Sequence, residues 1–272
     1  MNRQLLWDCH MHSSFSSDSS TPMENMIRRS IELGLKGITF TEHLDPDYPV
    51  TPDSLDFSLD IPAYREKLQK LQDTYRDQIQ VRFGIELGLQ MHLGEYFDSL
   101  LSQTPFDFVI GSSHLVHGYD PYYPEFFEER KEFLCYMEYF ESILENISAY
   151  DGFDVYGHID YVVRYGPNKN REYSYGRYKD ILDEILKKLI SMGKGIELNT
   201  GGYHYGLGEP NPCTAVIRRY RELGGEIITI GADAHTPDKI ACAFDKAASV
   251  LEACGFRYYT IFKDRKPEFI SL

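Results

Sequence analysis

Short apolar runs alternate with longer amphipathic segments along the whole chain. The short runs are rich in β-branched and aromatic residues and predict strands, whereas the longer segments repeat apolar residues at helical spacing. The predicted strands are Leu5–His12, Lys36–Thr41, Ile79–Glu86, Asp107–Gly111, Phe153–His158, Lys194–Asn199, Glu226–Gly231 and Tyr258–Phe262. The predicted helices are Pro22–Leu33, Pro62–Arg76, Gly94–Ser102, Glu125–Tyr150, Tyr178–Met192, Thr214–Leu223 and Pro237–Ala253.

The order of these segments predicts the fold class. Seven or eight βα units follow one another at roughly 30- to 45-residue spacing, which is typical of an α/β protein with a parallel sheet, most simply closed into a barrel. We find no composition break or low-complexity linker, and we expect residues 1–272 to form a single domain.

Local signals mark two connections. Thr21-Pro22-Met23-Glu24 is typical of a capping box with proline at the first helical position. The acidic, Pro-rich loop at 44–60 is too long for a plain connection, so we expect it to form part of a site. The last predicted strand is followed only by a short tail.

Composition restricts the cellular compartment and the kinds of partner that we expect. No apolar run in the 272 residues approaches the roughly 20 needed to span a membrane, and the N-terminus carries no signal-peptide pattern. Five scattered cysteines without Cys-x-x-Cys pairing favour reduced thiols in a cytoplasm. Acidic residues exceed basic ones by 42 to 28 and no basic run occurs, which argues against nucleic-acid binding. The sequence indicates no oligomeric state.

Histidines and carboxylates stand where the predicted strands end. His10 and His12 are two residues apart on a strand, so both imidazoles point to one side. Carboxyl ends of barrel strands meet around one mouth, which therefore collects side chains from six strands. These candidate metal ligands are His10, His12, His43, Glu86, His114, His158, Asp233 and His235, with Asp18 close by in the loop after the first strand.

This ligand set predicts chemistry on a phosphate ester. Nitrogen and carboxylate ligands without thiolate suit zinc, manganese or iron, and nine ligands suit two or three divalent ions. Glu86 has two oxygens and can bridge two of them. Ions about 3.5–4 Å apart can share a hydroxide that attacks phosphorus in line, which is the mechanism we expect. Three such ions leave the mouth net positive by about 3, so an anionic small molecule is attracted to an acidic protein.

The strand-end motifs resemble those of the PHP (polymerase and histidinol phosphatase) family. The resemblance runs from residue 8 to about 240, through Asp8-Cys9-His10-Met11-His12, Phe40-Thr41-Glu42-His43, Gly84-Ile85-Glu86, Gly111-Ser112-Ser113-His114, Gly157-His158-Ile159-Asp160 and Gly231-Ala232-Asp233-Ala234-His235. It implies a distorted, TIM-like (β/α)7 barrel with a trinuclear metal centre. By motif, His10, His12, Glu86 and Asp233 would hold the first ion, Glu86, His114 and His158 the second, and Asp18, His43 and His235 the third.

Glu42, the 197–200 segment and Leu207-Gly208-Glu209-Pro210 resemble the histidinol-phosphatase branch of the family. That branch implies hydrolysis of L-histidinol phosphate to L-histidinol and phosphate in histidine biosynthesis. The chain departs from the branch at Asn199-Thr200-Gly201-Gly202-Tyr203-His204, where an Asn-Thr-Ser-Gly-Leu-Arg run is usual. Either His204 replaces that arginine in binding phosphate, or Arg218 or Arg219 folds in.

Several further residues are candidates for substrate contact. Arg164 is the expected phosphate clamp, because a planar guanidinium pairs two oxygens, although a surface ion pair is the plain alternative. His117 and Tyr161 are expected near substrate. Glu42 either receives a substrate ammonium or orients a ligand histidine. Asp233, His235 and a metal-bound water are the candidate proton donors to the leaving group.

Two other functions compete with this one. The first is a PHP phosphoesterase for another small phosphate ester or a nucleotide, which the charge of −14 does not exclude. The second is a non-catalytic protein with structural metal. A structural site is normally closed by four ligands, so nine ligands at an open mouth argue against it.

Overall fold

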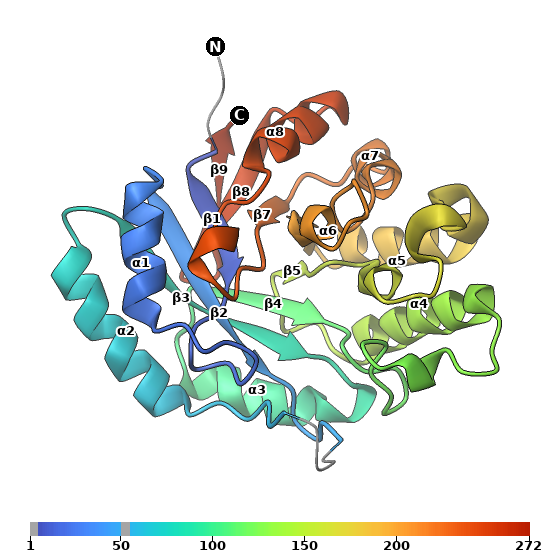
Figure 1. Cartoon of the computed structure of the whole chain (residues 1–272), viewed down its shortest axis with the longest axis horizontal. Helices are drawn as coiled ribbons and strands as arrows, with labels where there is room; N and C mark the ends of the chain where they lie inside the picture. The colour runs from blue at the N-terminus through green and yellow to red at the C-terminus, as the bar shows by residue number, and fades with distance from the viewer. Residues whose placement is uncertain (1–4, 50–54) are drawn as a thin grey trace.

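A parallel sheet of seven strands, in the order β1 to β7, forms the centre of the molecule (Figure 1). The computed structural model describes residues 5–49 and 55–272. The strands are β1 Trp7–Met11, β2 Gly37–Leu44, β3 Gln80–Gly88, β4 Phe108–Ser112, β5 Val155–Tyr156, β6 Gly195–Asn199 and β7 Ile228–Gly231. Because each strand pairs in parallel with the next, every carboxyl end lies at the same edge, as the predicted α/β barrel requires.

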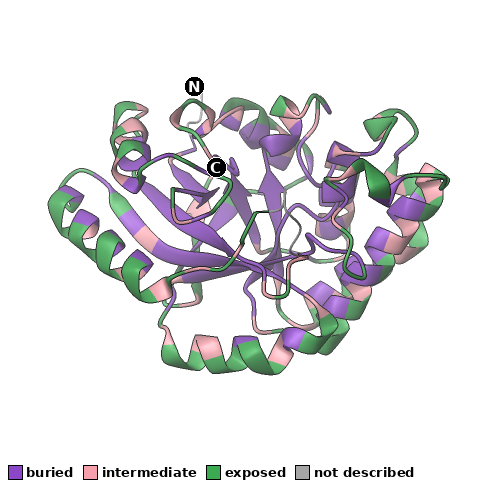
Figure 2. Ribbon diagram, turned by 60° about the horizontal axis from the view of Figure 1, so that its bottom comes forward, coloured by how far each residue is buried: buried purple, intermediate pink, exposed green. Residues whose placement is uncertain are grey.

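Helices cover the outside of the sheet (Figure 1). They are α1 Met23–Glu32, α2 Ile61–Tyr75, α3 Gly94–Gln103, α4 Glu132–Ala149, α5 Lys179–Ser191, α6 Gly201–His204, α7 Thr214–Glu222 and α8 Phe244–Ala253. Each long helix buries an apolar stripe and exposes a polar one, while the strands are buried on both sides (Figure 2). Near-continuous apolar strands are expected for a sheet covered in this way.

The two ends of the sheet meet directly. Met11, at the end of β1, forms a parallel bridge with Ala234 just beyond β7. The Asp233 amide donates to the His10 carbonyl at 2.9 Å, and the His12 amide donates to the Ala234 carbonyl at 2.9 Å. These bonds nearly close a seven-stranded barrel at the edge where the histidines lie. The predicted distorted (β/α)7 fold is therefore confirmed.

The C-terminal segment differs from the prediction. β8 (Tyr258–Lys263) does not extend the parallel sheet but pairs antiparallel with β9 (Lys266–Ser271), which was predicted as a plain tail. Thr260 of β8 contacts both ends of the barrel sheet, accepting from the Ile228 amide and from the Cys9 thiol. β9 is largely exposed and carries charged residues, so it has no apolar run that would have revealed a strand.

Several predicted boundaries were also wrong. The predicted helix Glu125–Tyr150 is a short 3-10 turn, Pro124–Phe126, followed by α4, which begins only at Glu132. Pro22 is the N-cap rather than the first residue of α1, and the Thr21 hydroxyl donates to the His235 carbonyl at 3.1 Å instead of capping the helix. The predicted helix Pro237–Ala253 is divided into a short 3-10 turn, Pro237–Lys239, and α8. Glu42 and His43 lie within β2, which is longer than predicted.

Within the described residues, no helix is both long and apolar enough to cross a membrane. The segment 50–54 of the predicted 44–60 loop lies outside the described residues. The rest of that loop reaches the mouth of the barrel, where Asp45, Tyr48 and Phe57 line a pocket, as expected for a loop that forms part of a site.

Candidate metal centre

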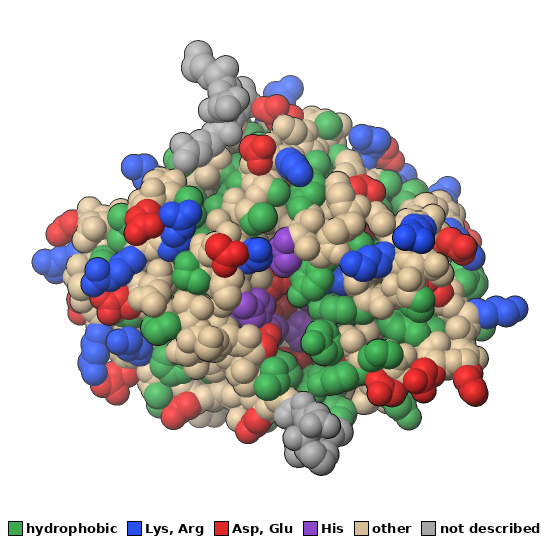
Figure 3. All heavy atoms as spheres, viewed as in Figure 1, with side chains coloured by type: hydrophobic (Ala, Val, Ile, Leu, Met, Phe, Trp, Pro, Cys, Tyr) green, Lys and Arg blue, Asp and Glu red, His purple; other side chains and the backbone are tan. Residues whose placement is uncertain are grey.

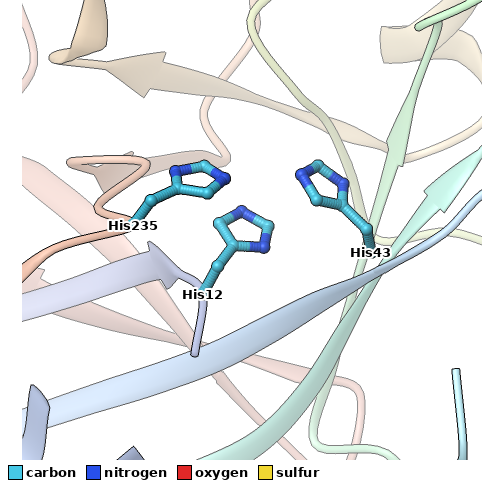
Figure 4. Close-up of side chains that lie close together, drawn as sticks. All are labelled: His12, His43 and His235. Carbon is cyan, nitrogen blue, oxygen red and sulfur yellow. The ribbon is translucent and has the colours of Figure 1, made fainter. Parts of the chain in front are cut away.

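All nine predicted ligands gather at the carboxyl edge of the sheet. His12, His43 and His235 arrive from the end of β1, from β2 and from the segment after β7, and their rings converge (Figure 4). The His12 ring stacks on both of the others, with centroids 4.1 Å from His43 and 4.3 Å from His235. Histidines are visible at the bottom of a hollow in the surface (Figure 3).

The first predicted ligand group has the dimensions of a metal site. His10 Nε2 lies 3.1 Å from His12 Nε2, 3.2 Å from Glu86 Oε2 and 3.6 Å from Asp233 Oδ1. His12 Nε2 lies 3.6 Å from the same Glu86 oxygen and 3.5 Å from the same Asp233 oxygen. Four ligands held 2.0–2.1 Å from a tetrahedral ion are roughly 3.3 Å apart. The residues present therefore fit a divalent cation at their centre.

The other two groups are assembled around carboxylates. Glu86 turns its second oxygen, Oε1, to His158 Nε2 at 2.9 Å and His114 Nε2 at 3.4 Å. Asp18 Oδ2 lies 2.9 Å from His235 Nε2 and 3.4 Å from His43 Nε2. Glu86 thus joins the first and second groups, as its two oxygens allow.

His43 links Glu86 to the third group. Its Nδ1 is 3.0 Å from Glu86 Oε2 while its Nε2 faces Asp18. The ligand groups therefore form one continuous cluster rather than separate sites.

Hydrogen bonds fix which nitrogen of several histidines is free to bind metal. His10 donates through Nδ1 to Glu197 Oε1 at 2.7 Å, and His114 donates through Nδ1 to Asp45 Oδ1 at 2.7 Å. Each neutral imidazole then carries an unprotonated Nε2, which is the form that binds a metal ion. His235 follows the same rule, donating through Nδ1 to the Asp233 carbonyl at 3.0 Å.

Glu42 orients His12 through a serine. The Ser16 hydroxyl donates to Glu42 Oε2 at 2.6 Å and accepts from His12 Nδ1 at 3.2 Å. Ser13 supplies the remaining donors to Glu42 through its amide and its hydroxyl. Glu42 is fully buried. Of the two predicted roles, the structure favours orientation of a ligand histidine, since no substrate ammonium can reach this carboxylate.

Buried atoms without hydrogen-bond partners point to the same chemistry. His43 Nδ1, His158 Nδ1 and His235 Nε2 are buried and make no hydrogen bond. Two of these nitrogens nevertheless face carboxylate oxygens at about 3 Å. For His235, whose Nδ1 donates to the Asp233 carbonyl, the unprotonated Nε2 faces Asp18, which is unfavourable unless a cation lies between them.

Electrostatics favour positive charge in the cluster. Burial lowers the pKa of His10, but Glu197, Glu86 and Asp233 outweigh it and hold that pKa well above its usual range. Burial raises the pKa of Glu86, yet the surrounding histidines hold it well below its usual range. The Glu86 carboxylate therefore favours its ionised form, and a cation bound at these residues would compensate its charge.

Two backbone features bring Asp233 and His10 together. Gly231 ends β7 so close to β1 that a Cβ atom there would lie 2.3 Å from the His10 Cβ and 2.4 Å from Glu197 Oε1. Asp233 follows with φ at 56°, a left-handed conformation that is uncommon outside glycine and often found at functional sites. That conformation turns the Asp233 carboxylate into the cluster.

Arg164 lies beside the metal ligands and is not a surface residue. Its side chain is buried and donates to Asp233 Oδ2, Asn199 Oδ1 and Asn211 Oδ1, each at 2.9 Å. The guanidinium packs over the rings of Tyr205 and Tyr161, 4.8 and 5.4 Å from their centroids. Three donors are thus used of the five that arginine has, and two remain for an anion in the pocket.

Comparison with known proteins identifies the fold. The family model of the PHP domain matches residues 8–201. The chain belongs to the PHP domain family. It is 31% identical over 260 residues to the histidinol-phosphatase of Lactococcus lactis subsp. lactis, covering 95% of each chain. It is 32% identical over 256 residues to the probable histidinol-phosphatase of Clostridium acetobutylicum, covering 93% of this chain and 95% of that one.

Two solved structures are similar to this PHP domain. The histidinol phosphate phosphatase of Lactococcus lactis, complexed with zinc, L-histidinol and phosphate, superimposes with a TM-score of 0.89 at 30% identity, covering 96% of this chain and 98% of that one. The putative histidinol phosphatase of Listeria monocytogenes superimposes with a TM-score of 0.77, covering 88% and 99%. At 19% identity the second structure supports the fold alone.

The PHP pocket includes some predicted substrate contacts and not others. Arg164 and Tyr161 line it, together with ligand residues. His204 is exposed, and Arg164 is close enough to add to the lowering of its pKa by partial burial, but the neighbouring Tyr205 provides the lining side chain. Arg219 does not fold in, because its guanidinium pairs with Asp183 at 2.7 Å. Arg218 is exposed on α7.

His117 does not reach the PHP pocket. It stands half-exposed with φ at 48°, and its two ring nitrogens pair with Glu138 at 3.3 Å and Glu145 at 3.0 Å. It is absent from the residues that line the pocket, so the structure gives its predicted substrate contact no support.

Sequence reasoning missed the residues that support the ligands. Glu197 and Asp45 hold His10 and His114, and Asn199 and Asn211 hold Arg164. Glu197 could have been found from the sequence, because it lies near the end of a predicted strand, as the candidate ligands do. Asp45, Tyr48 and Asp120 carry no such signal, because they reach the pocket from loops.

Proposed function

We propose that this protein is a metal-dependent phosphomonoesterase that hydrolyses L-histidinol phosphate to L-histidinol and phosphate. One observation carries the proposal. The candidate metal ligands form one cluster, and Asp233 of that cluster bonds Arg164. Candidate cation sites and a guanidinium therefore lie at one pocket. The solved relative that holds zinc, L-histidinol and phosphate supports the choice of substrate.

The ligand set suits two or three divalent ions, with zinc, manganese and iron all compatible with imidazole and carboxylate donors. Bound at these residues, the ions would supply Lewis acidity toward the phosphoryl oxygens and an activated water. The protein supplies the geometry, since Glu197, Asp45 and Ser16 fix the free nitrogens of His10, His114 and His12.

Arg164 binds the phosphoryl group in this proposal. Asp233 and two asparagine oxygens hold the guanidinium in place, so its two remaining donors are already oriented. Asp233 itself is shared by His10, His12 and Arg164, and despite its burial their charges hold its pKa well below the usual range. We therefore assign Asp233 to metal binding and to orientation of Arg164, and leave proton donation to His235 or to water.

We further propose that residues 1–272 work as one domain in the cytoplasm. All five cysteines are free, and four of them are buried, which is consistent with reduced thiols. The buried apolar residues form one cluster shared by the sheet and its surrounding helices.

Phosphate release from L-histidinol phosphate tests the proposal. The enzyme is stripped with a chelator, reloaded with zinc, manganese or iron, and compared with His10→Ala and the surface control His92→Ala. His92 is exposed and pairs with Asp47 away from the ligand cluster, so its loss should leave the centre intact. We expect turnover that requires added metal, that is lost in His10→Ala and that is retained in His92→Ala. Activity that survives both chelation and His10→Ala, or faster turnover of nucleotides than of histidinol phosphate, would contradict the proposal.

A further inference from the structure

Asp120 presents a carboxylate to the active-site pocket from the loop after β4. It lines the same pocket as the metal ligands and Arg164. Two donors fix its position: Tyr48 donates through its hydroxyl to Oδ2 at 2.6 Å, and the Tyr122 amide donates to Oδ1 at 2.7 Å. The carboxylate is thus oriented from both sides but still has acceptor capacity, since each oxygen has two lone pairs.

This carboxylate lacks a positive partner. In the ranges 5–49 and 55–272, no Lys, Arg or His lies within ion-pair distance of Asp120. Asp45, the other carboxylate nearby, already accepts a hydrogen bond from His114. Burial raises the pKa of Asp120, against the opposing effects of its hydrogen bonds from Tyr48 and Tyr122 and of the nearby His114. A partly buried carboxylate without an ion-pair partner is costly, so a cation in the pocket would stabilise it.

Aromatic rings form much of the wall of this pocket. Those that line the pocket are Tyr48, Phe57, Tyr161, Tyr165 and Tyr205. Tyr48 and Phe57 pack at 4.7 Å, and Tyr161 and Tyr165 at 5.0 Å, between ring centroids. Hydrophobic side chains border part of the hollow in which the histidines are visible (Figure 3). Aromatic faces attract cations and pack against planar groups.

The pocket therefore carries groups of both charges. Arg164 and the metal ligands attract anions, whereas Asp120, held by Tyr48, attracts cations. We infer that Asp120, held by Tyr48, binds the positive charge of the leaving group and selects phosphate esters of cationic alcohols. The inference rests on the proposed function, because L-histidinol carries an ammonium group next to the carbon that bears the ester oxygen.

A purely structural role is the alternative. Tyr48 and Asp120 join the loop after β2 to the loop after β4, and this link by itself would order the mouth of the pocket. The two roles predict different results. Loss of a structural link impairs all substrates alike, and it does so whether the tyrosine or the aspartate is changed. Loss of a cation subsite impairs cationic substrates selectively, and it depends on the carboxylate more than on the tyrosine.

The test compares kcat/KM for cationic and uncharged leaving groups in the metal-loaded enzyme. L-histidinol phosphate and ethanolamine phosphate are the cationic esters, and p-nitrophenyl phosphate is the uncharged one. The variants are Asp120→Asn, Tyr48→Phe and the control Glu125→Gln, which removes an exposed charge from the same loop. We expect Asp120→Asn to lower the ratio of cationic to uncharged kcat/KM about 10- to 100-fold, as for loss of a charge-assisted hydrogen bond. Tyr48→Phe should lower it less, and Glu125→Gln should leave it unchanged.

Other outcomes are equally decisive. An unchanged ratio in Asp120→Asn overturns the inference, and equal losses on both kinds of ester in Asp120→Asn and Tyr48→Phe assign the pair to structure alone. A wild-type enzyme with no preference for cationic esters also overturns it. If the wild type prefers ethanolamine phosphate to the uncharged ester, and Asp120→Asn loses that preference, the inference stands even where histidinol phosphate is not hydrolysed. In that case only the proposed function fails.

Discussion

His10 of β1 donates a hydrogen bond of 2.7 Å from Nδ1 to Glu197 of β6, and both side chains are completely buried. The second oxygen of Glu197 accepts from the His158 amide at 3.1 Å and from Asn199 at 3.0 Å. One carboxylate thereby orients ligands of two predicted metal groups and the asparagine that holds Arg164.

Glu197→Gln is expected to weaken metal binding by about 10- to 100-fold, the usual effect of changing a residue that orients a metal-bound histidine. The amide group that replaces one oxygen faces donors on both sides and cannot accept from them. Competition with a chelator measures the affinity, and Glu184→Gln, an exposed change on α5, is the control. Unchanged metal affinity in Glu197→Gln would show that Glu197 does not orient the metal-binding histidines.

Gly231→Ala tests the close approach of β7 to β1. The new Cβ would lie 2.3 Å from the His10 Cβ, so the histidine must move away from Asp233. We expect less metal bound per chain and a loss of activity that is larger than the loss of thermal stability. Gly176→Ala is the matched control, because nothing lies within 4 Å of a Cβ there. Full metal content in Gly231→Ala would show that metal binding does not require the close approach of β7 to His10.

Arg164→Lys is expected to lower kcat/KM about 100-fold or more, corresponding to roughly 2.7 kcal/mol of transition-state stabilisation. Lysine keeps the charge but cannot bond Asp233, Asn199 and Asn211 while presenting two further donors. Competitive inhibition by inorganic phosphate should weaken in parallel. Arg177→Lys, on an exposed turn, is the control, and equal kinetics in the two variants would exclude Arg164 from phosphate binding.

Acid stability depends on a second, purely structural pair. Arg219 donates to Asp183 through two nitrogens at 2.9 and 2.7 Å, and these bonds lower the pKa of Asp183 to about 2. The folded-state pKa lies below the unfolded value of about 3.9, so this stabilisation is complete above pH ~4 and is lost as pH falls toward 2.

Metal-free wild type should therefore lose stability between pH 4 and pH 2 more steeply than metal-free Asp183→Asn. Urea midpoints across that range measure the difference, with Glu184→Gln as a control on the same helix. Parallel pH profiles for wild type and Asp183→Asn would refute the assignment.

The sequence predicted where the candidate ligands meet, because their position on strands carries the information. His10, His43 and Glu86 lie at the carboxyl ends of parallel strands, so a correct strand order already places them together. Thr21 shows where local rules fail: its hydroxyl bonds the His235 carbonyl, more than two hundred residues away, and a tertiary contact replaces the expected helix cap.

Supporting residues were harder to predict for a related reason. Asp45 acts on His114 and Asp120 bonds Tyr48, and each partner lies more than sixty residues away along the chain. No periodicity or spacing encodes such pairs, which exist only after the loops have folded. The β8–β9 hairpin was missed because its last strand is exposed and lacks an apolar run.

The number of metal ions per chain tests the central claim most directly. Glu86 faces histidines of the first and second groups through different oxygens, so one substitution should affect both. Elemental analysis of metal-loaded wild type should give two or three ions per chain, and Glu86→Gln should lose more than one of them together with activity. A single ion in the wild type, or an unchanged metal content in Glu86→Gln, would contradict a shared cluster of cations at the mouth of this barrel.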